Sequence, residues 1–150
     1  MEIDELMRAL AADIKLEGLE PDENGAWGLS IDGMAVTFAD RANDGKLLIC
    51  ADVGEPPAEG REALYAVLLQ TMYLGDGTQG AEFSLDDEGK VVLQRTLDLR
   101  YLDLAEFKSV LEGFVNVLER WRKTLEDFRP AAAAAPAAAP AAEMGGFLQV

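Results

Sequence analysis

Residues 61–74 read REALYAVLLQTMYL, which predicts a helix that is apolar almost all the way round. Leu64, Leu68 and Met72 form one stripe of this helix, while Tyr65 and Leu69 belong to a second. A single domain of 150 residues has little room to bury a helix on every side. The expected solution is a partner subunit that covers the second stripe.

The chain before this helix changes its hydrophobic period. Apolar residues at steps of three and four predict an amphipathic helix over residues 2–16. A period of two then predicts strands on either side of Asp32-Gly33, which is a strong hairpin signal. A third strand is expected over residues 46–53, and its apolar centre LLICA predicts that both of its faces are covered.

The chain after this helix continues with strands and ends in a long helix. Two strands are predicted over residues 81–85 and 91–97, joined by an acidic turn. Asp103 and Glu106 form the pattern of a capping box, and apolar residues at 3-4-3-4 spacing extend the last helix to near Phe128. The order α-β-β-β-α-β-β-α predicts the α+β class, with an antiparallel sheet packed against helices.

The composition changes abruptly at Pro130, so we expect a domain over residues 1–129 and a tail over 130–150. The tail begins PAAAAAPAAAPAA, an Ala/Pro stretch that predicts a semi-extended linker. It continues into MGGFLQV, which is either a frayed tail or a tethered peptide that docks in a groove on this protein or another. The docking residues would be Met144, Phe147, Leu148 and Val150.

Charge and composition exclude several classes of function. Acidic residues outnumber basic ones 28 to 13, and the net charge of −15 disfavours binding to nucleic acid or to an anionic membrane surface. The chain has no histidine and one cysteine, Cys50, so Ser–His and Cys–His pairs and His- or Cys-rich metal sites are excluded. Neither a signal peptide nor a membrane span is predicted, and a soluble cytoplasmic protein is expected.

The stretch GDGTQG, residues 75–80, matches the G-x-G-x-x-G pattern of dinucleotide-binding loops. Such a loop follows a strand and opens a helix, whereas here a helix precedes Gly75 and a strand follows Gly80. We therefore interpret Gly75 as a left-handed residue at the end of the helix and the loop as structural. No cofactor is predicted.

The acidic turns and the candidate nucleophile in the sequence do not predict an enzyme. The turns that begin at Glu20 and Asp40 lack the carboxylate that a calcium loop needs at its twelfth position. The acidic residues 86–88 lie on a hairpin turn, where solvent exposure is the ordinary reason for charge. Cys50 lies in an apolar strand, which favours a packing role.

The second half of the chain resembles a known family. The helix that ends at Leu74, the glycine loop, FSLDDEGKVVLQRTL and LDLAEFKSVLEGFV, up to Trp121, are similar to the class I chaperones of bacterial type III secretion, the Tir-chaperone family. The first half fits in element order and length, so the resemblance spans about residues 1–129. The Ala/Pro tail departs from the family pattern.

The resemblance implies a homodimer that binds the N-terminal segment of a secreted effector and delivers it to the secretion apparatus, with the secretion ATPase as a further candidate partner. For the dimer interface we expect Tyr65, Leu68, Leu69, Met72, Tyr73 and Phe83. For effector binding we expect Leu6, Met7, Leu10, Val36, Phe38, Leu48 and Cys50. Two alternatives stay open: a regulatory protein of the same fold that binds a folded cytoplasmic regulator, and a small acidic enzyme or calcium-binding domain.

Overall fold

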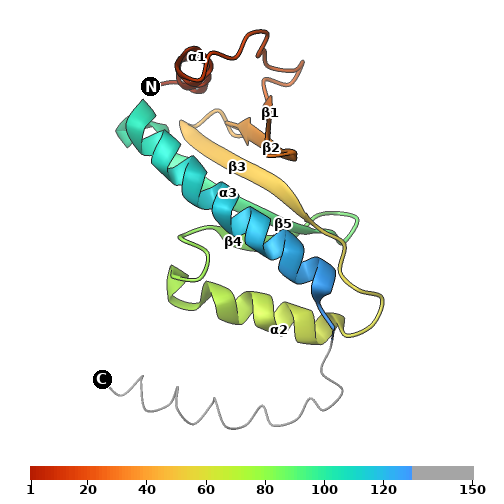
Figure 1. Ribbon diagram of the computed structural model, residues 1–150. Helices are drawn as coiled ribbons and strands as arrows, with labels where there is room; N and C mark the ends of the chain where they lie inside the picture. Colours follow the sequence, from red (N-terminus) through yellow and green to blue (C-terminus); the bar gives the residue numbers. More distant parts are fainter. Residues whose placement is uncertain (130–150) are drawn as a thin grey trace, which may run out of the picture.

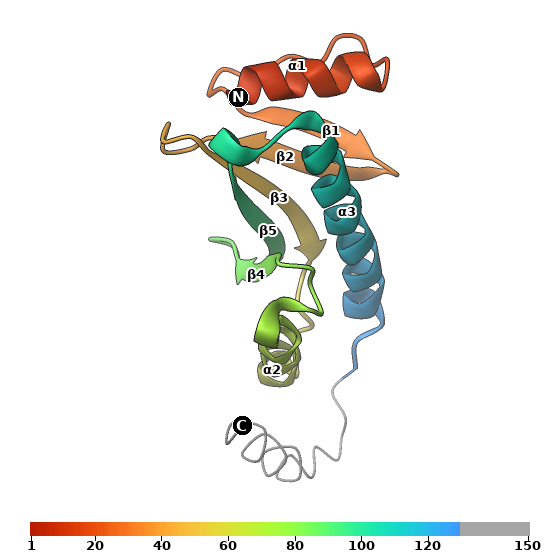
Figure 2. The same cartoon turned by 90° about the vertical axis from the view of Figure 1, so that its left-hand side faces the viewer.

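Three helices pack with one five-stranded antiparallel sheet in the computed structural model, which describes residues 1–129 (Figures 1 and 2). The predicted α+β class and the predicted element order are confirmed. In chain order the elements are α1 (Ile3–Asp13), β1 (Trp27–Ile31), β2 (Met34–Ala39), β3 (Lys46–Gly54), α2 (Arg61–Met72), β4 (Glu82–Leu85), β5 (Val91–Asp98) and α3 (Leu104–Asp127). Short 3-10 turns follow α2 and β5, η1 (Tyr73–Gly75) and η2 (Leu99–Tyr101).

The sheet has the strand order β1-β2-β3-β5-β4, which makes β1 and β4 its two edges. The predicted hairpin joins β1 to β2, with Ile31 opposite Met34. Asp32 and Gly33 between them both have positive φ angles, of 50° and 81°, as a two-residue type I′ turn requires. At the centre of the sheet β3 pairs with β5, so residues about 50 positions apart lie side by side, for example Leu47 and Leu97.

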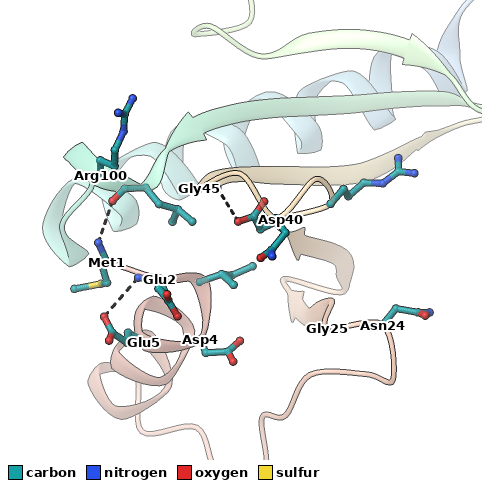
Figure 3. A pocket seen from close by; sticks show the side chains of 13 residues that line it. Met1, Glu2, Asp4, Glu5, Asn24, Gly25, Asp40, Gly45 and Arg100 are labelled. Atoms are coloured by element: carbon teal, nitrogen blue, oxygen red, sulfur yellow. Dashed lines mark hydrogen bonds between the residues drawn. The ribbon is translucent and has the colours of Figure 1, made fainter.

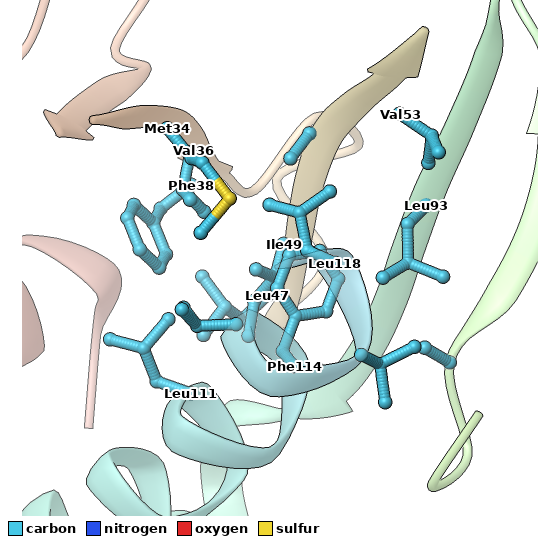
Figure 4. Packing of buried hydrophobic residues seen from close by; sticks show 14 of the residues in the cluster. Met34, Val36, Phe38, Leu47, Ile49, Val53, Leu93, Leu111, Phe114 and Leu118 are labelled. Carbon is cyan, nitrogen blue, oxygen red and sulfur yellow. The ribbon is translucent and has the colours of Figure 1, made fainter. Parts of the chain in front are cut away.

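The core lies between one face of the sheet and α3, which crosses that face diagonally (Figures 1 and 4). Alternate residues of β2 and β3 point into it, among them Phe38 and Ile49, both fully buried. The ring of Phe38 meets that of Phe107 edge to face at 5.7 Å. Each buried large apolar side chain contributes about 1.5–3 kcal/mol, so this layer supplies much of the stabilisation.

The opposite face of β3 is less covered than its apolar sequence predicts. Leu48 and Cys50 point away from α3 and stay only half-buried among the described residues. Residues 1–129 therefore cover only one face of this strand fully, and the prediction that both faces are covered stays a prediction.

The helix ends follow local chemistry. The carboxylate of Asp103 accepts a hydrogen bond from the backbone N–H of Glu106 at 2.8 Å, as the predicted cap requires.

The glycine loop, residues 75–80, connects α2 to β4. Its buried Thr78 hydroxyl donates a hydrogen bond to the Ala81 carbonyl at 2.6 Å. Gly75 is left-handed, as predicted, but α2 already ends at Met72, and Leu74 is left-handed as well. The loop turns the chain from α2 into β4, which supports its structural interpretation.

Candidate partner-binding grooves

An apolar groove of about 250 Å³ lies between α2 and the edge strand β4. Leu69 on its rim is 65% exposed and Leu85 is 48% exposed, which is unusual for leucines gathered in one place. α3 supports the groove through Phe83, whose ring packs against that of Trp121 at a centroid distance of 5.1 Å. We call it the α2–β4 groove; its lining residues are Tyr65, Leu68, Leu69, Met72, Phe83, Ser84 and Leu85.

Five of the six residues predicted for the dimer interface line this one groove, and the sixth, Tyr73, is exposed just beyond α2. Among the described residues of α2, only Leu64 and Leu68 are buried. Val67 and Leu74, with Tyr73, add to the exposed apolar surface of this region. The packing of one chain therefore leaves most of the apolar surface of α2 without cover by the described residues.

A second groove, of about 450 Å³, lies between the end of α1, the edge strand β1 and the middle of α3. Its floor is aliphatic and includes Leu10, Leu111 and Val115, all buried. Ile14, which is 45% exposed, stands at its rim. We call it the α1–α3 groove; its lining residues are Leu10, Ile14, Leu29, Ile31, Asp32, Lys108, Leu111, Glu112, Val115 and Asn116.

Polar contacts fix α1 beside this groove. The indole N–H of Trp27 donates to Asp4 at 3.0 Å, and the guanidinium of Arg8 stacks over the Trp27 ring at 5.4 Å. Lys108 of α3 forms an ion pair with Asp13 at the end of α1. The groove wall is thus held at both ends of α1 and from two other elements.

The structure places most residues of the predicted effector-binding set in the core. Leu6, Met7, Leu10, Val36 and Phe38 are at most 2% exposed, because the apolar stripe of α1 and the inner face of β2 pack together and against α3. Only Leu10 reaches a groove. Leu48 and Cys50 lie on the other face of the sheet.

Three residues that form the accessible part of the α1–α3 groove are not among those predicted for effector binding. Leu29 and Ile31 continue the alternating apolar pattern of the edge strand β1. Ile14 is the last apolar residue of the α1 stripe. Their apolar spacing was visible in the sequence, but it does not tell which members of a stripe remain uncovered.

Polar groups elsewhere serve local structure. A polar pocket of about 790 Å³ near the start of α1 contains Asp40, which accepts backbone hydrogen bonds from Asp44 and Gly45, and Glu2 and Glu5, which form the capping box of α1 (Figure 3). At its rim the Arg100 guanidinium donates to Asp98 and holds the pKa of that carboxyl well below its ordinary range.

The turns and the cysteine likewise offer no reactive group. Asp22 lies in the turn that begins at Glu20, and Asp86 lies in the turn between β4 and β5. Each carboxylate accepts hydrogen bonds from two backbone N–H groups of its own turn. Burial, reinforced by the nearby Asp52 carboxylate, raises the pKa of the Cys50 thiol and so disfavours the thiolate. Within residues 1–129 no group of three His, Cys, Asp or Glu side chains could hold a metal ion.

None of the helices in residues 1–129 has the length and apolar character that crossing a membrane requires. The predicted docking residues Met144, Phe147, Leu148 and Val150 lie outside the described residues.

The chain belongs to the Tir chaperone protein (CesT) family, whose profile matches residues 5–122. A protein of Chlamydia pneumoniae is 32% identical over 110 residues, which cover 71% of this chain and 82% of that protein. The suspected family is thereby confirmed.

Solved structures share the fold. A chain of the ExsC–ExsE complex superposes with a TM-score of 0.68 at 26% identity, covering 89% of this chain and 100% of that one. A chain of the HopA1–SchA chaperone–effector complex has a TM-score of 0.65 at 20% identity, and the match covers 80% of this chain and 92% of that one. A chain of the ExoU–SpcU complex from the type III secretion system of Pseudomonas aeruginosa has a TM-score of 0.65 at 16% identity, and the match covers 84% of this chain and 99% of that one.

Proposed function

We propose that this chain is a type III secretion chaperone of the bacterial cytoplasm. As a homodimer it binds the N-terminal segment of a secreted effector, keeps it competent for secretion and hands it to the apparatus, with the secretion ATPase as the partner in that step. Family membership and the chaperone–effector complex among its structural relatives support this function. The observation that carries it is the α1–α3 groove beside the edge strand β1.

The groove and the strand edge together suit an extended peptide. An edge strand presents unpaired backbone N–H and C=O groups, to which a peptide adds as a further strand. Leu29 and Ile31 belong both to β1 and to the groove, so a peptide paired with β1 places alternate side chains near the aliphatic floor. Such a peptide loses conformational freedom on binding, and the contact area must offset that cost.

The α2–β4 groove supports a two-fold interface. In a two-fold dimer the same patch meets itself, so the exposed Leu69 of one protomer can enter the groove of the other. The groove is lined almost wholly by apolar side chains, and none of its lining residues is charged, which matches the core of a stable homodimer interface. Dimerisation would double the number of peptide-binding grooves available to one effector segment.

Purification of the tagged protein from its native host, followed by native mass spectrometry, tests the function. Two copies that hold one secreted protein, with protection confined to an N-terminal stretch of that protein, are expected. A dimer that holds a folded cytoplasmic regulator would favour the regulatory alternative. A monomer without a partner would contradict both the function and the interface, and flat calorimetric titrations with calcium and nucleotide would remove the enzyme and calcium alternatives.

Ile14→Asp is expected to weaken effector binding by about 2 kcal/mol, or roughly 30-fold, because it places a charge where an apolar anchor would bind. Ile14 is 45% exposed, so the substitution should leave the melting temperature nearly unchanged. Calorimetric titration with the co-purified effector segment measures the effect. Leu16→Asp is the matched control, because Leu16 is 39% exposed and does not line the groove. Equal affinities of the two variants would exclude the α1–α3 groove as the effector site.

A further inference from the structure

The segment 144–150, MGGFLQV, is apolar in a chain that is otherwise rich in acidic residues. It lies beyond residue 122, where the family match ends, and outside residues 1–129, which the structure describes. We propose that this segment occupies the α1–α3 groove of its own chain when no effector is bound, and that it competes with the effector for that groove. The competition, but not the docking itself, rests on the proposed function.

The linker is long enough for this contact. The groove meets α3 at residues 111–116, and α3 runs on to Asp127. From Leu111 to Asp127 the helix advances about 24 Å, at ~1.5 Å per residue. Residues 130–142 can span about 40 Å at ~3.1 Å per residue, so the segment can return along α3 to the groove.

The chemistry of the segment fits the groove. Residues 144–150 carry no charged side chain, so none of their side chains is repelled by the rim carboxylates of Asp32 and Glu112. Met144, Phe147, Leu148 and Val150 can cover an aliphatic floor, and the volume of about 450 Å³ is typical of a peptide or ligand site. The α2–β4 groove is smaller, at about 250 Å³, and the second protomer fills it in the proposed dimer.

Tethering makes a weak contact sufficient. A tether whose length matches the span to its site gives an effective concentration of about 1 mM. With an intrinsic dissociation constant of about 0.1 mM, the groove is filled roughly ten to one and a competing peptide binds about tenfold more weakly. Such a segment would leave the groove only for a partner that makes further contacts, for example along β1.

Hydrogen exchange in the full chain without any partner tests the docking. We compare Phe147→Asp, which places a charge in the docking segment, with Ala141→Asp, which places the same charge in the linker. The backbone amides of residues 10–16 and 29–31 are expected to exchange up to tenfold faster in Phe147→Asp than in Ala141→Asp. Equal rates in both variants would overturn the docking, and so would a change confined to residues 65–72.

Effector affinity then tests the competition. The Phe147→Asp variant should bind the co-purified effector segment about tenfold more tightly than the Ala141→Asp variant, by calorimetry. Equal affinities would overturn the competition. Because the exchange experiment contains no effector, its outcome does not depend on whether the proposed function is correct, and the two failures can be told apart.

Discussion

Leu69→Asp is expected to raise the dissociation constant of the proposed dimer by about three orders of magnitude while each protomer stays folded. Leu69 is 65% exposed in the single chain, so the substitution should change the free energy of unfolding of the protomer by no more than about 0.5 kcal/mol. In a two-fold interface the substitution occurs twice, and a loss of about 2 kcal/mol at each copy gives a factor of about 10³.

Sedimentation equilibrium over a range of protein concentrations measures this change. Tyr101→Asp is the control, because Tyr101 is 75% exposed but lies after β5, away from the α2–β4 groove. It should leave the dimer intact. A Leu69→Asp protein that remains dimeric at the same concentrations would place the interface elsewhere.

Phe38→Ala is expected to lower the free energy of unfolding by about 3–5 kcal/mol, because it leaves a cavity in the layer between β2 and α3. Phe38 is fully buried, and its ring packs edge to face on Phe107. Since the free energy of unfolding of a small domain is about 5–15 kcal/mol, this loss should be visible as a large shift of the urea midpoint. The effector affinity of the molecules that remain folded should change little.

Thr37→Ala is the control for this experiment. Thr37 is the neighbouring residue of β2, exposed on the opposite face, and its truncation should cost less than about 1 kcal/mol. If Phe38→Ala left stability nearly unchanged and abolished effector binding, its role in the core would be contradicted and its predicted role in effector binding supported.

The elements of the fold could be predicted because their signals are local. The Asp32-Gly33 turn allows the positive φ angles of a tight hairpin, and Asp103 caps α3 through a contact three residues away. The end of α2 was predicted less well, since Leu74 adopts a left-handed conformation that its residue type does not favour.

The two grooves differ in how far the sequence could predict them. Five of the six residues predicted for the dimer interface line the α2–β4 groove, because a helix with apolar residues on every side must keep some of them uncovered in a small domain. The interface itself stays a prediction. Five of the seven residues predicted for effector binding are buried in the single chain, because the first helix and the second strand each carry one apolar face that packs into the core. Their role in effector binding stays a prediction.

The amino-acid sequence by itself determined the α+β order, the turns, the acidic surface and the surplus of apolar residues on α2, since each depends on residue type and short-range spacing. Only the tertiary structure decided that Phe38 and Met7 are core while Ile14 and Ile31 line a surface groove. Apolar spacing shows which side of an element avoids water. Which neighbour covers that side, and how far along, depends on where α1, β1 and α3 meet in space.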